Sequence, residues 1–149
     1  MKRIKIGNRK KSRPEIENLY ACGPPPFNLT HNDVLDHVMS MREDGNRFVV
    51  MLGIKNKGRK PYHLMCGEHS YAVLICRKQS VCQFILCMGQ NAAKRYCEHR
   101  TLRKADFMPG DGWYIMAVDC SFESMEEVFR ILDECYDYAL KKFYVKKNT

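Results

Sequence analysis

The segment 124–143 constrains the fold more than any other part of the chain. Its apolar residues recur every three or four positions while its charged residues lie off that stripe, which predicts an amphipathic helix packed on another layer. Ser124 and Glu127 have the spacing of a capping box at the start of this helix. The apolar stripe consists of Met125, Val128, Phe129, Leu132, Cys135, Tyr136, Ala139 and Phe143.

Short apolar runs, rich in β-branched and aromatic residues, predict the layer that this helix needs. Turn-forming segments such as GEHS and RKQS separate them, which is typical of antiparallel strands with tight connections. Two further helices are expected, one over 31–43, capped by Thr30, and one over 91–100. The predicted strands are 48–54, 62–66, 71–76, 81–88 and 113–119.

The order of these elements is helix, four strands, helix, strand, helix. It predicts an α+β fold, a two-layer sandwich in which an antiparallel sheet of about five strands packs with about three helices. Residues 1–26 are interpreted as a basic, flexible N-terminal segment with a proline linker, 27–144 as a single α+β domain, and 145–149 as a basic tail.

Positive charge is concentrated at the two ends of the chain. The net charge is +8, yet residues 1–13 carry seven Lys or Arg and no acid, and residues 141–149 carry four Lys. Such segments predict contact with nucleic acid or an acidic protein, or else simply a solvated tail. The candidate nucleic-acid-binding residues are Lys2, Arg3, Lys5, Arg9, Lys10, Lys11 and Arg13, with Lys55, Lys57, Arg59 and Lys60 from a basic loop.

The location is expected to be cytoplasmic, with no membrane contact. No apolar run approaches the roughly 18 residues that cross a bilayer. The basic N-terminus also lacks the apolar core of a secretory signal. In such a reducing compartment, the eight cysteines are expected to be free thiols.

The cysteines of the stretch CRKQSVCQFILCMG, residues 76–89, are predicted to fill the core. Cys82 and Cys87 differ in parity along one predicted strand, so they point to opposite faces and cannot share a metal without a bulge. The chain also contains no C-x-x-C pair, the usual unit of a structural zinc site. Buried cysteine behaves as a small apolar residue.

A weaker metal candidate is the H-x-x-C-x-x-H pattern of His63, Cys66 and His69. The alternative is a pair of edge or surface histidines beside a core thiol. The chain has no nucleophile elbow, phosphate-binding loop or H-E-x-x-H motif, so no catalytic residue and no cofactor is predicted. An enzyme whose groups converge only in space stays open as an alternative.

Both faces of the predicted sheet are apolar, whereas a sheet covered on one side usually alternates apolar and polar residues. The second face therefore needs a cover: the first helix, the PPPF segment, a second copy of the chain or a ligand. A homodimer or docked partner would place Phe84 or Tyr114 near the contact, depending on which parity faces inward.

Three segments of the chain resemble the MmcQ/YjbR-like family over roughly residues 62–143. They are HLMCGEHSYAVLI, VCQFILCMGQNAAKRY and GWYIMAVDCSFESMEEVFRILDECYDYAL. The shared features are a hairpin at a glycine turn, a strand leading into a short helix, a tryptophan strand and a terminal helix. The corresponding residues here are Gly67, Tyr71, Trp113, Cys135 and Tyr136.

The resemblance implies a two-layer α/β fold like that of frataxins and secretion chaperones, a DNA-binding role and no established enzymatic activity. The leading hypothesis is a small non-enzymatic binding module or regulator that contacts nucleic acid through basic tails and loops. The alternatives are a protein–protein adaptor or homodimer that uses the second sheet face, and an enzyme or metal-binding protein.

Overall fold

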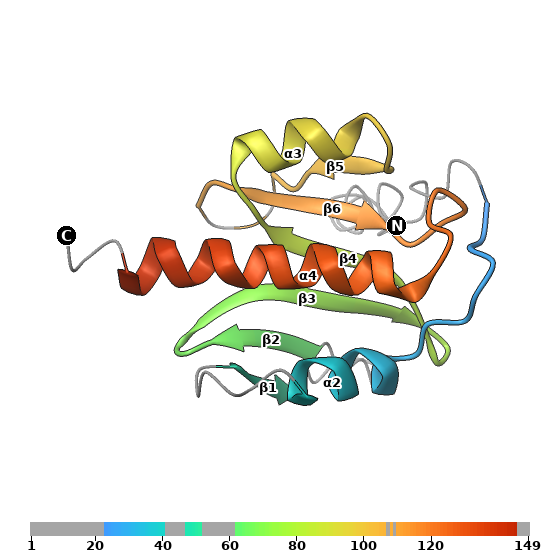
Figure 1. The fold of residues 1–149 in the computed structure, drawn as a ribbon, viewed down its shortest axis with the longest axis horizontal. Coiled ribbons are helices and arrows are strands. Elements are labelled where there is room, and N and C mark those ends of the chain that lie inside the picture. Colours follow the sequence, from blue (N-terminus) through green and yellow to red (C-terminus); the bar gives the residue numbers. More distant parts are fainter. Residues whose placement is uncertain (1–22, 41–46, 52–61, 107, 109, 146–149) are drawn as a thin grey trace, which may run out of the picture.

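The computed structural model describes residues 23–40, 47–51, 62–106, 108 and 110–145. Within these ranges the chain forms one antiparallel sheet and three α-helices, so the predicted α+β class is confirmed (Figure 1). The helices are α2 (His31–Ser40), α3 (Gln90–Cys97) and α4 (Met125–Leu140). The strands are β1 (Arg47–Met51), β2 (Tyr62–Cys66), β3 (His69–Arg77), β4 (Ser80–Cys87), β5 (Leu102–Lys104) and β6 (Trp113–Ala117).

The six strands are ordered β1-β2-β3-β4-β6-β5 across the sheet. The first four form the predicted meander, and β6 then pairs antiparallel with β4. The sequence did not predict β5, because it has three residues and two of them, Arg103 and Lys104, are exposed cations.

Two-residue turns set the register of the central hairpins. Gly67 has a φ of +63° in the turn between β2 and β3, where Cys66 pairs with His69. Lys78 has a φ of +61° in the turn between β3 and β4, where Arg77 pairs with Ser80. Positive φ at such turns matches the twist of the two strands they join.

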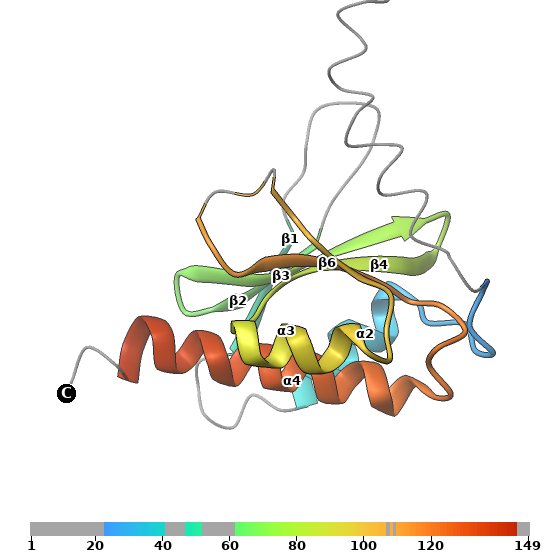
Figure 2. The same cartoon turned by 90° about the horizontal axis from the view of Figure 1, so that it is seen from above.

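The three described helices all lie on one face of the sheet (Figure 2). The main core fills the space between them and the strands, with α4 in the centre, and Phe84, Leu86 and Met116 are fully buried there. Tyr71 of β3 meets Tyr136 of α4 edge to face, with ring centroids 5.4 Å apart. The amphipathic stripe of segment 124–143 is therefore used as predicted.

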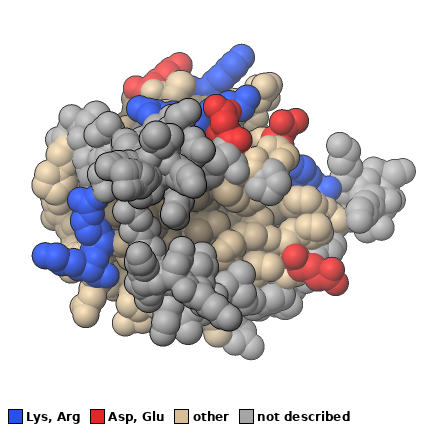
Figure 3. Space-filling model, turned by 180° about the vertical axis from the view of Figure 1, so that it is seen from behind, with Lys and Arg blue, Asp and Glu red and all other residues tan. Residues whose placement is uncertain are grey.

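The opposite sheet face carries a second apolar cluster, so the expectation of two apolar faces is confirmed. Seen from behind, Lys and Arg lie at the margins of the described surface, away from its uncharged middle (Figure 3). The first helix and the PPPF segment were candidate covers of this face, but Val34 and Val38 of α2, and Phe27, pack in the main core instead. The buried residues of the second cluster are Val73, Ile85, Ala105, Ile115 and Ala117.

The two predicted helix starts have different outcomes. The Thr30 cap is confirmed: Asp33 N donates to Thr30 Oγ1 at 3.2 Å, and Thr30 N donates to Asp33 Oδ2 at 3.0 Å. The capping box at Ser124 is wrong, because Ser124 caps α4 without a side-chain hydrogen bond. Glu127 instead accepts the N–H of Glu123 at 3.0 Å.

The C-terminal end of α4 continues as a π-helical turn, Lys141–Val145. Its Phe143 ring stacks on the imidazole of His69, with centroids 3.8 Å apart. This contact fixes the turn against the start of β3. No described helix is long and apolar enough to cross a membrane.

Candidate functional site

Two adjoining hollows lie where the start of α3, the C-terminal half of α4 and the loop between β5 and β6 meet. Their volumes are about 400 and 350 Å³. Met88, Gln90 and Tyr138 line both hollows, so the two form one divided depression, which we call the Tyr138 groove. Figure 1 shows that α3 and β6 begin toward the end of the sheet where α4 ends.

Two glycines allow Tyr138 to lie in this position. A Cβ added at Gly89, the N-cap of α3, would come within 3.2 Å of the Tyr138 ring. Gly112, in the loop before β6, has a φ of +90°, and a Cβ there would lie 3.3 Å from the Met88 carbonyl oxygen and 3.9 Å from the Tyr138 hydroxyl. Met88 N donates to Gly112 O at 2.8 Å, which ties the two segments together.

One side of the groove contains a bonded cluster between α3 and α4. Arg95 and Tyr96 of α3 each donate to a different carboxylate oxygen of Glu134 on α4. Burial, followed by the bond to Glu134, raises the pKa of Tyr96 to about 12, so its hydroxyl stays protonated as a donor. The cluster holds α3 against α4 and leaves the exposed side chains of Gln90 and Asn91 at the opening.

The other side of the groove is lined by two lysines from distant segments. Lys104 belongs to β5 and Lys142 to the π-helical turn after α4, and both are exposed. The ammonium of Lys142 lies 5.8 Å from the centroid of the Tyr138 ring and 5.3 Å from that of Phe143. Asp111 lines the same hollow as a partial counter-charge.

The chemistry of this groove is that of binding. It offers the ring of half-buried Tyr138, two lysine ammonium groups and two amide side chains. The nearby Cys87 thiol is buried, and burial raises its pKa despite the opposing effect of Lys142, so it stays protonated. These features favour an anionic, flat ligand over covalent chemistry.

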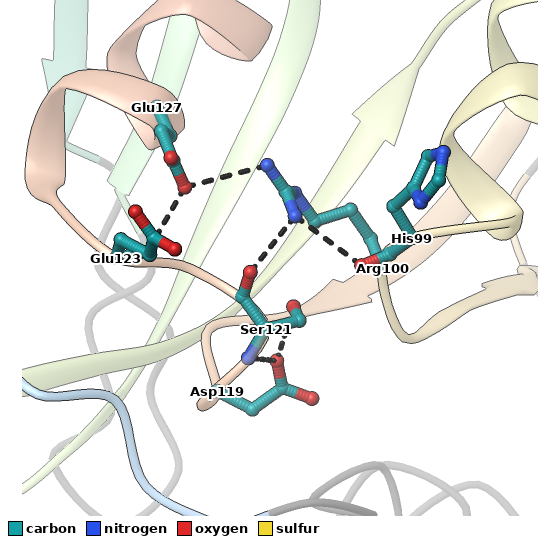
Figure 4. Close-up of polar contacts among 6 residues, drawn as sticks. All are labelled: His99, Arg100, Asp119, Ser121, Glu123 and Glu127. Carbon is teal, nitrogen blue, oxygen red and sulfur yellow. Dashed lines mark hydrogen bonds and ion pairs between the residues drawn. The ribbon is translucent and has the colours of Figure 1, made fainter.

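A second polar cluster joins the end of α3 to the start of α4 (Figure 4). Arg100 donates to Ser121 O at 2.8 Å, contacts Glu127 at 3.4 Å and lies over the Phe122 ring at 4.3 Å. Asp119, fully buried, accepts from the Ser121 hydroxyl at 2.6 Å. These contacts pair the buried Asp119 carboxylate and fix the loops, although Nε of Arg100 is buried without a hydrogen-bond partner, so we interpret the cluster as structural.

The predicted basic residues cannot be placed against this groove. The candidates within residues 2–13 and 55–60 lie outside the described residues.

Phe84 and Tyr114, the candidate interface residues, lie on the helix-covered face, because β4 and β6 pair Phe84 with Met116 and Leu86 with Tyr114. A partner on the opposite face would therefore meet other side chains.

The weak metal candidates His63, Cys66 and His69 have separate environments. His63 Nδ1 bonds Ser70 Oγ at 3.2 Å, and burial lowers the pKa of its ring. Cys66 is fully buried in the main core, whereas His69 stacks on Phe143. Within the described ranges, no three His, Cys, Asp or Glu residues are grouped as a metal site would require.

Seven of the eight cysteines are described, and all seven are free thiols. Cys66, Cys82, Cys87 and Cys135 are buried, as core filling predicts. Burial and the neighbouring Cys82 raise the pKa of Cys76 to about 11. The exposed thiols are Cys97 and Cys120, and Cys22 lies outside the described residues.

That Tyr138, Lys104 and Lys142 share a site was not predicted from the sequence. Lys104 is distant from the other two along the chain, and although Tyr138 and Lys142 are four positions apart, Lys142 reads simply as part of the basic segment 141–149. The available signals are Gly89 and Gly112, which both come next to strands, yet glycine there is equally typical of an ordinary turn.

Comparisons with known proteins assign no family. No protein-family model matches the chain, and no solved structure matches it. A stretch of 61 residues, 41% of this chain, is 34% identical to part of the protein translocase subunit SecD of Petrotoga mobilis (strain DSM 10674 / SJ95). That stretch spans 13% of the SecD sequence, so the functional argument depends on the groove itself.

Proposed function

We propose that the protein is a small non-enzymatic binding module that holds nucleic acid through the Tyr138 groove, assisted by its basic terminal segments. The observation that carries the proposal is the convergence of Lys104 and Lys142 beside the half-buried ring of Tyr138. Cations that contact phosphates and aromatic rings that contact bases are the usual components of sequence-tolerant nucleic-acid binding.

The position of Lys142 also supports this function. It belongs to the basic C-terminal segment 141–149, which carries Lys146 and Lys147 beyond the described residues. We also propose a cytoplasmic setting, consistent with the free thiols. The MmcQ/YjbR-like relationship is part of the same proposal, supported by Trp113 at the start of β6 and the buried Tyr136 of α4.

The test is fluorescence anisotropy with a labelled oligonucleotide, titrated at salt concentrations from about 50 to 200 mM. We expect Lys104→Glu/Lys142→Glu to weaken binding by roughly tenfold or more at the lowest salt, because both phosphate contacts become repulsive. The matched control is Arg77→Glu/Lys78→Glu, which changes the charge equally at the β3–β4 hairpin, at the other end of the sheet from the groove (Figure 1).

The salt dependence of the affinity distinguishes the contribution of the groove from that of the N-terminal segment. Deleting residues 1–13 removes seven cations and should reduce the slope of log affinity against log salt, because fewer counterions are released. If the groove and hairpin variants lose the same amount of affinity, the loss comes from the change in net charge and not from the groove. No measurable binding to DNA or RNA at low salt would refute the proposed function.

A further inference from the structure

We propose that the Tyr138 groove receives one nucleotide unit of a single strand, with the base against Tyr138 and its phosphate between Lys104 and Lys142. This inference rests on the proposed nucleic-acid-binding function and specifies its ligand. It makes the protein selective for unpaired nucleotides, a property that basic tails alone would not provide.

The division of the groove is the first argument. Its two hollows, of about 400 and 350 Å³, are each of the size that holds a small ligand group. Tyr138 lies between them, yet their linings differ: amide groups and the paired Arg95 and Glu134 on the α3 side, and two lysines with one acid, Asp111, on the loop side. A nucleotide has the same division into a hydrogen-bonding base and an anionic phosphate.

The α3 side fits the edge of a base. Gln90 and Asn91 are exposed at its opening and each carries both a donor and an acceptor. The carboxylate of Glu134 is held by Arg95 and Tyr96, so its remaining lone pairs keep a fixed direction. Gly89 packs directly against the Tyr138 ring, where a Cβ would come within 3.2 Å of it, and so helps to fix the position of the ring.

The loop side fits a phosphate. Lys104 and Lys142 come from separate elements and line one hollow, where ammonium groups can pair with phosphate oxygens. Asp111 opposes them, but it is one exposed acid against two cations. Because Lys142 lies over the Tyr138 ring, a phosphate beside Lys142 would remain adjacent to a base at that ring.

The depth of Tyr138 argues against a duplex. The ring is half-buried between the start of α3 and the loop before β6, where Gly89 and Gly112 approach it. Bases of a duplex are already stacked and paired, so reaching this ring would require flipping one out. An unpaired base has a free face for an aromatic side chain at no such cost.

The experiment compares a labelled oligothymidylate of about 12 nucleotides with the same strand in a duplex, by anisotropy at low salt. We expect Tyr138→Ala to weaken single-strand binding roughly tenfold, the effect of losing one stacked base, and to leave duplex binding unchanged. Tyr138→Phe keeps the ring and should bind within about twofold of the wild type. Circular dichroism melting of each variant confirms folding.

Competition with unlabelled thymidine monophosphate tests whether the groove binds a free nucleotide or only a nucleotide within a strand. If it displaces the strand from the wild type but not from Tyr138→Ala, the free nucleotide is sufficient. If it does not, while single-strand selectivity still depends on the ring, the unit must belong to a strand. Either result supports the inference.

Different outcomes separate the inference from the function on which it rests. Wild-type protein that binds neither oligonucleotide at low salt refutes the proposed function. Wild-type protein that binds both, with Tyr138→Ala unaffected or equally weakened on both, overturns the nucleotide site and leaves nonspecific nucleic-acid binding in place.

Discussion

Gly110 and Gly112 offer a comparison within one loop that separates backbone conformation from close packing. Both have positive φ, +85° and +90°, where an L side chain is strained. A Cβ at Gly110 would have no atom within 4 Å, whereas a Cβ at Gly112 would lie 3.3 Å from the Met88 carbonyl oxygen. That carbonyl is backbone, and the Met88 N–H is bonded to Gly112 O, so it cannot move aside easily.

We therefore predict that alanine destabilises both positions, but Gly112 more. Gly110→Ala should lower the free energy of unfolding by about 1 kcal/mol, the cost of positive φ alone. Gly112→Ala should lower it by about a further 1 kcal/mol, because the added methyl group crowds the Met88 carbonyl. Urea denaturation of the two variants and the wild type measures the difference. Equal losses would show that the loop relaxes around the new methyl group.

The two helix caps show which residue-level features a sequence can predict. The Thr30–Asp33 cap is local, since both partners lie three positions apart and form both bonds. The Ser124–Glu127 box has the same spacing, but Glu127 also lies 3.4 Å from Arg100. Arg100 is distant along the chain, because it comes before β5 and β6 while Glu127 comes after them. A distant partner competes for the carboxylate, and spacing alone carries no information about it.

At the scale of elements, Arg100 joins the end of α3 to the start of α4. Its guanidinium donates to Ser121 O and contacts Glu127 (Figure 4). The central guanidinium carbon also lies over the Phe122 ring. The side chain is 18% exposed, so these contacts are largely shielded from water. The planar fork of arginine can make all of them at once, which the single ammonium of lysine cannot.

Replacing Arg100 should therefore loosen both helix ends. We predict that Arg100→Ala lowers the free energy of unfolding by about 2 kcal/mol and that Arg100→Lys recovers no more than half of that loss. Arg103→Ala, on the exposed edge strand β5, is the control and should change it by less than about 0.5 kcal/mol. Chemical denaturation gives the three values. Wild-type stability in Arg100→Lys would contradict a role for the fork.

The long elements are those the sequence predicted well. Segment 124–143 has a helical apolar stripe over several turns, and the central strands carry continuous apolar runs bounded by turns. The strand β5 and the π-helical turn Lys141–Val145 were missed, since each is too short to have a period. Both depend on partners: β5 pairs with β6, and Phe143 stacks on His69.

At the scale of the whole molecule, the Tyr138 groove could not be predicted. It needs the packing of α3 on α4 and the return of the chain from β5 to β6, so its lysines meet only after folding.

The two faces of the sheet, in contrast, were predicted in part. Alternation along β6 assigned its residues correctly to two sets, and the pairing of β6 with β4 decided which set meets the helices. Along β4 the alternation fails at Val81, which packs in the main core with Phe84 and Leu86, because the register between β3 and β4 shifts at that point.

The second sheet face bears on assembly, because a homodimer was one way to cover it. Ile115 and Ala117 are fully buried, and Val73 and Ile85 are 7% exposed, within a single chain. A second copy placed there would remove little further apolar area from water. Stable dimers bury about 1,200–2,000 Å² in total, so this cluster offers a poor basis for one.

We predict that the protein is a monomer over a wide range of concentration, with the molar mass of one chain in light scattering coupled to size exclusion. Ile115→Asp should unfold that chain, because it buries an unpaired charge in the second cluster. Ile75→Asp, at a half-buried position at the margin of the same cluster, is the control and should be tolerated better. A mass of two chains that Ile115→Asp converts to a folded monomer would instead establish this face as a dimer interface.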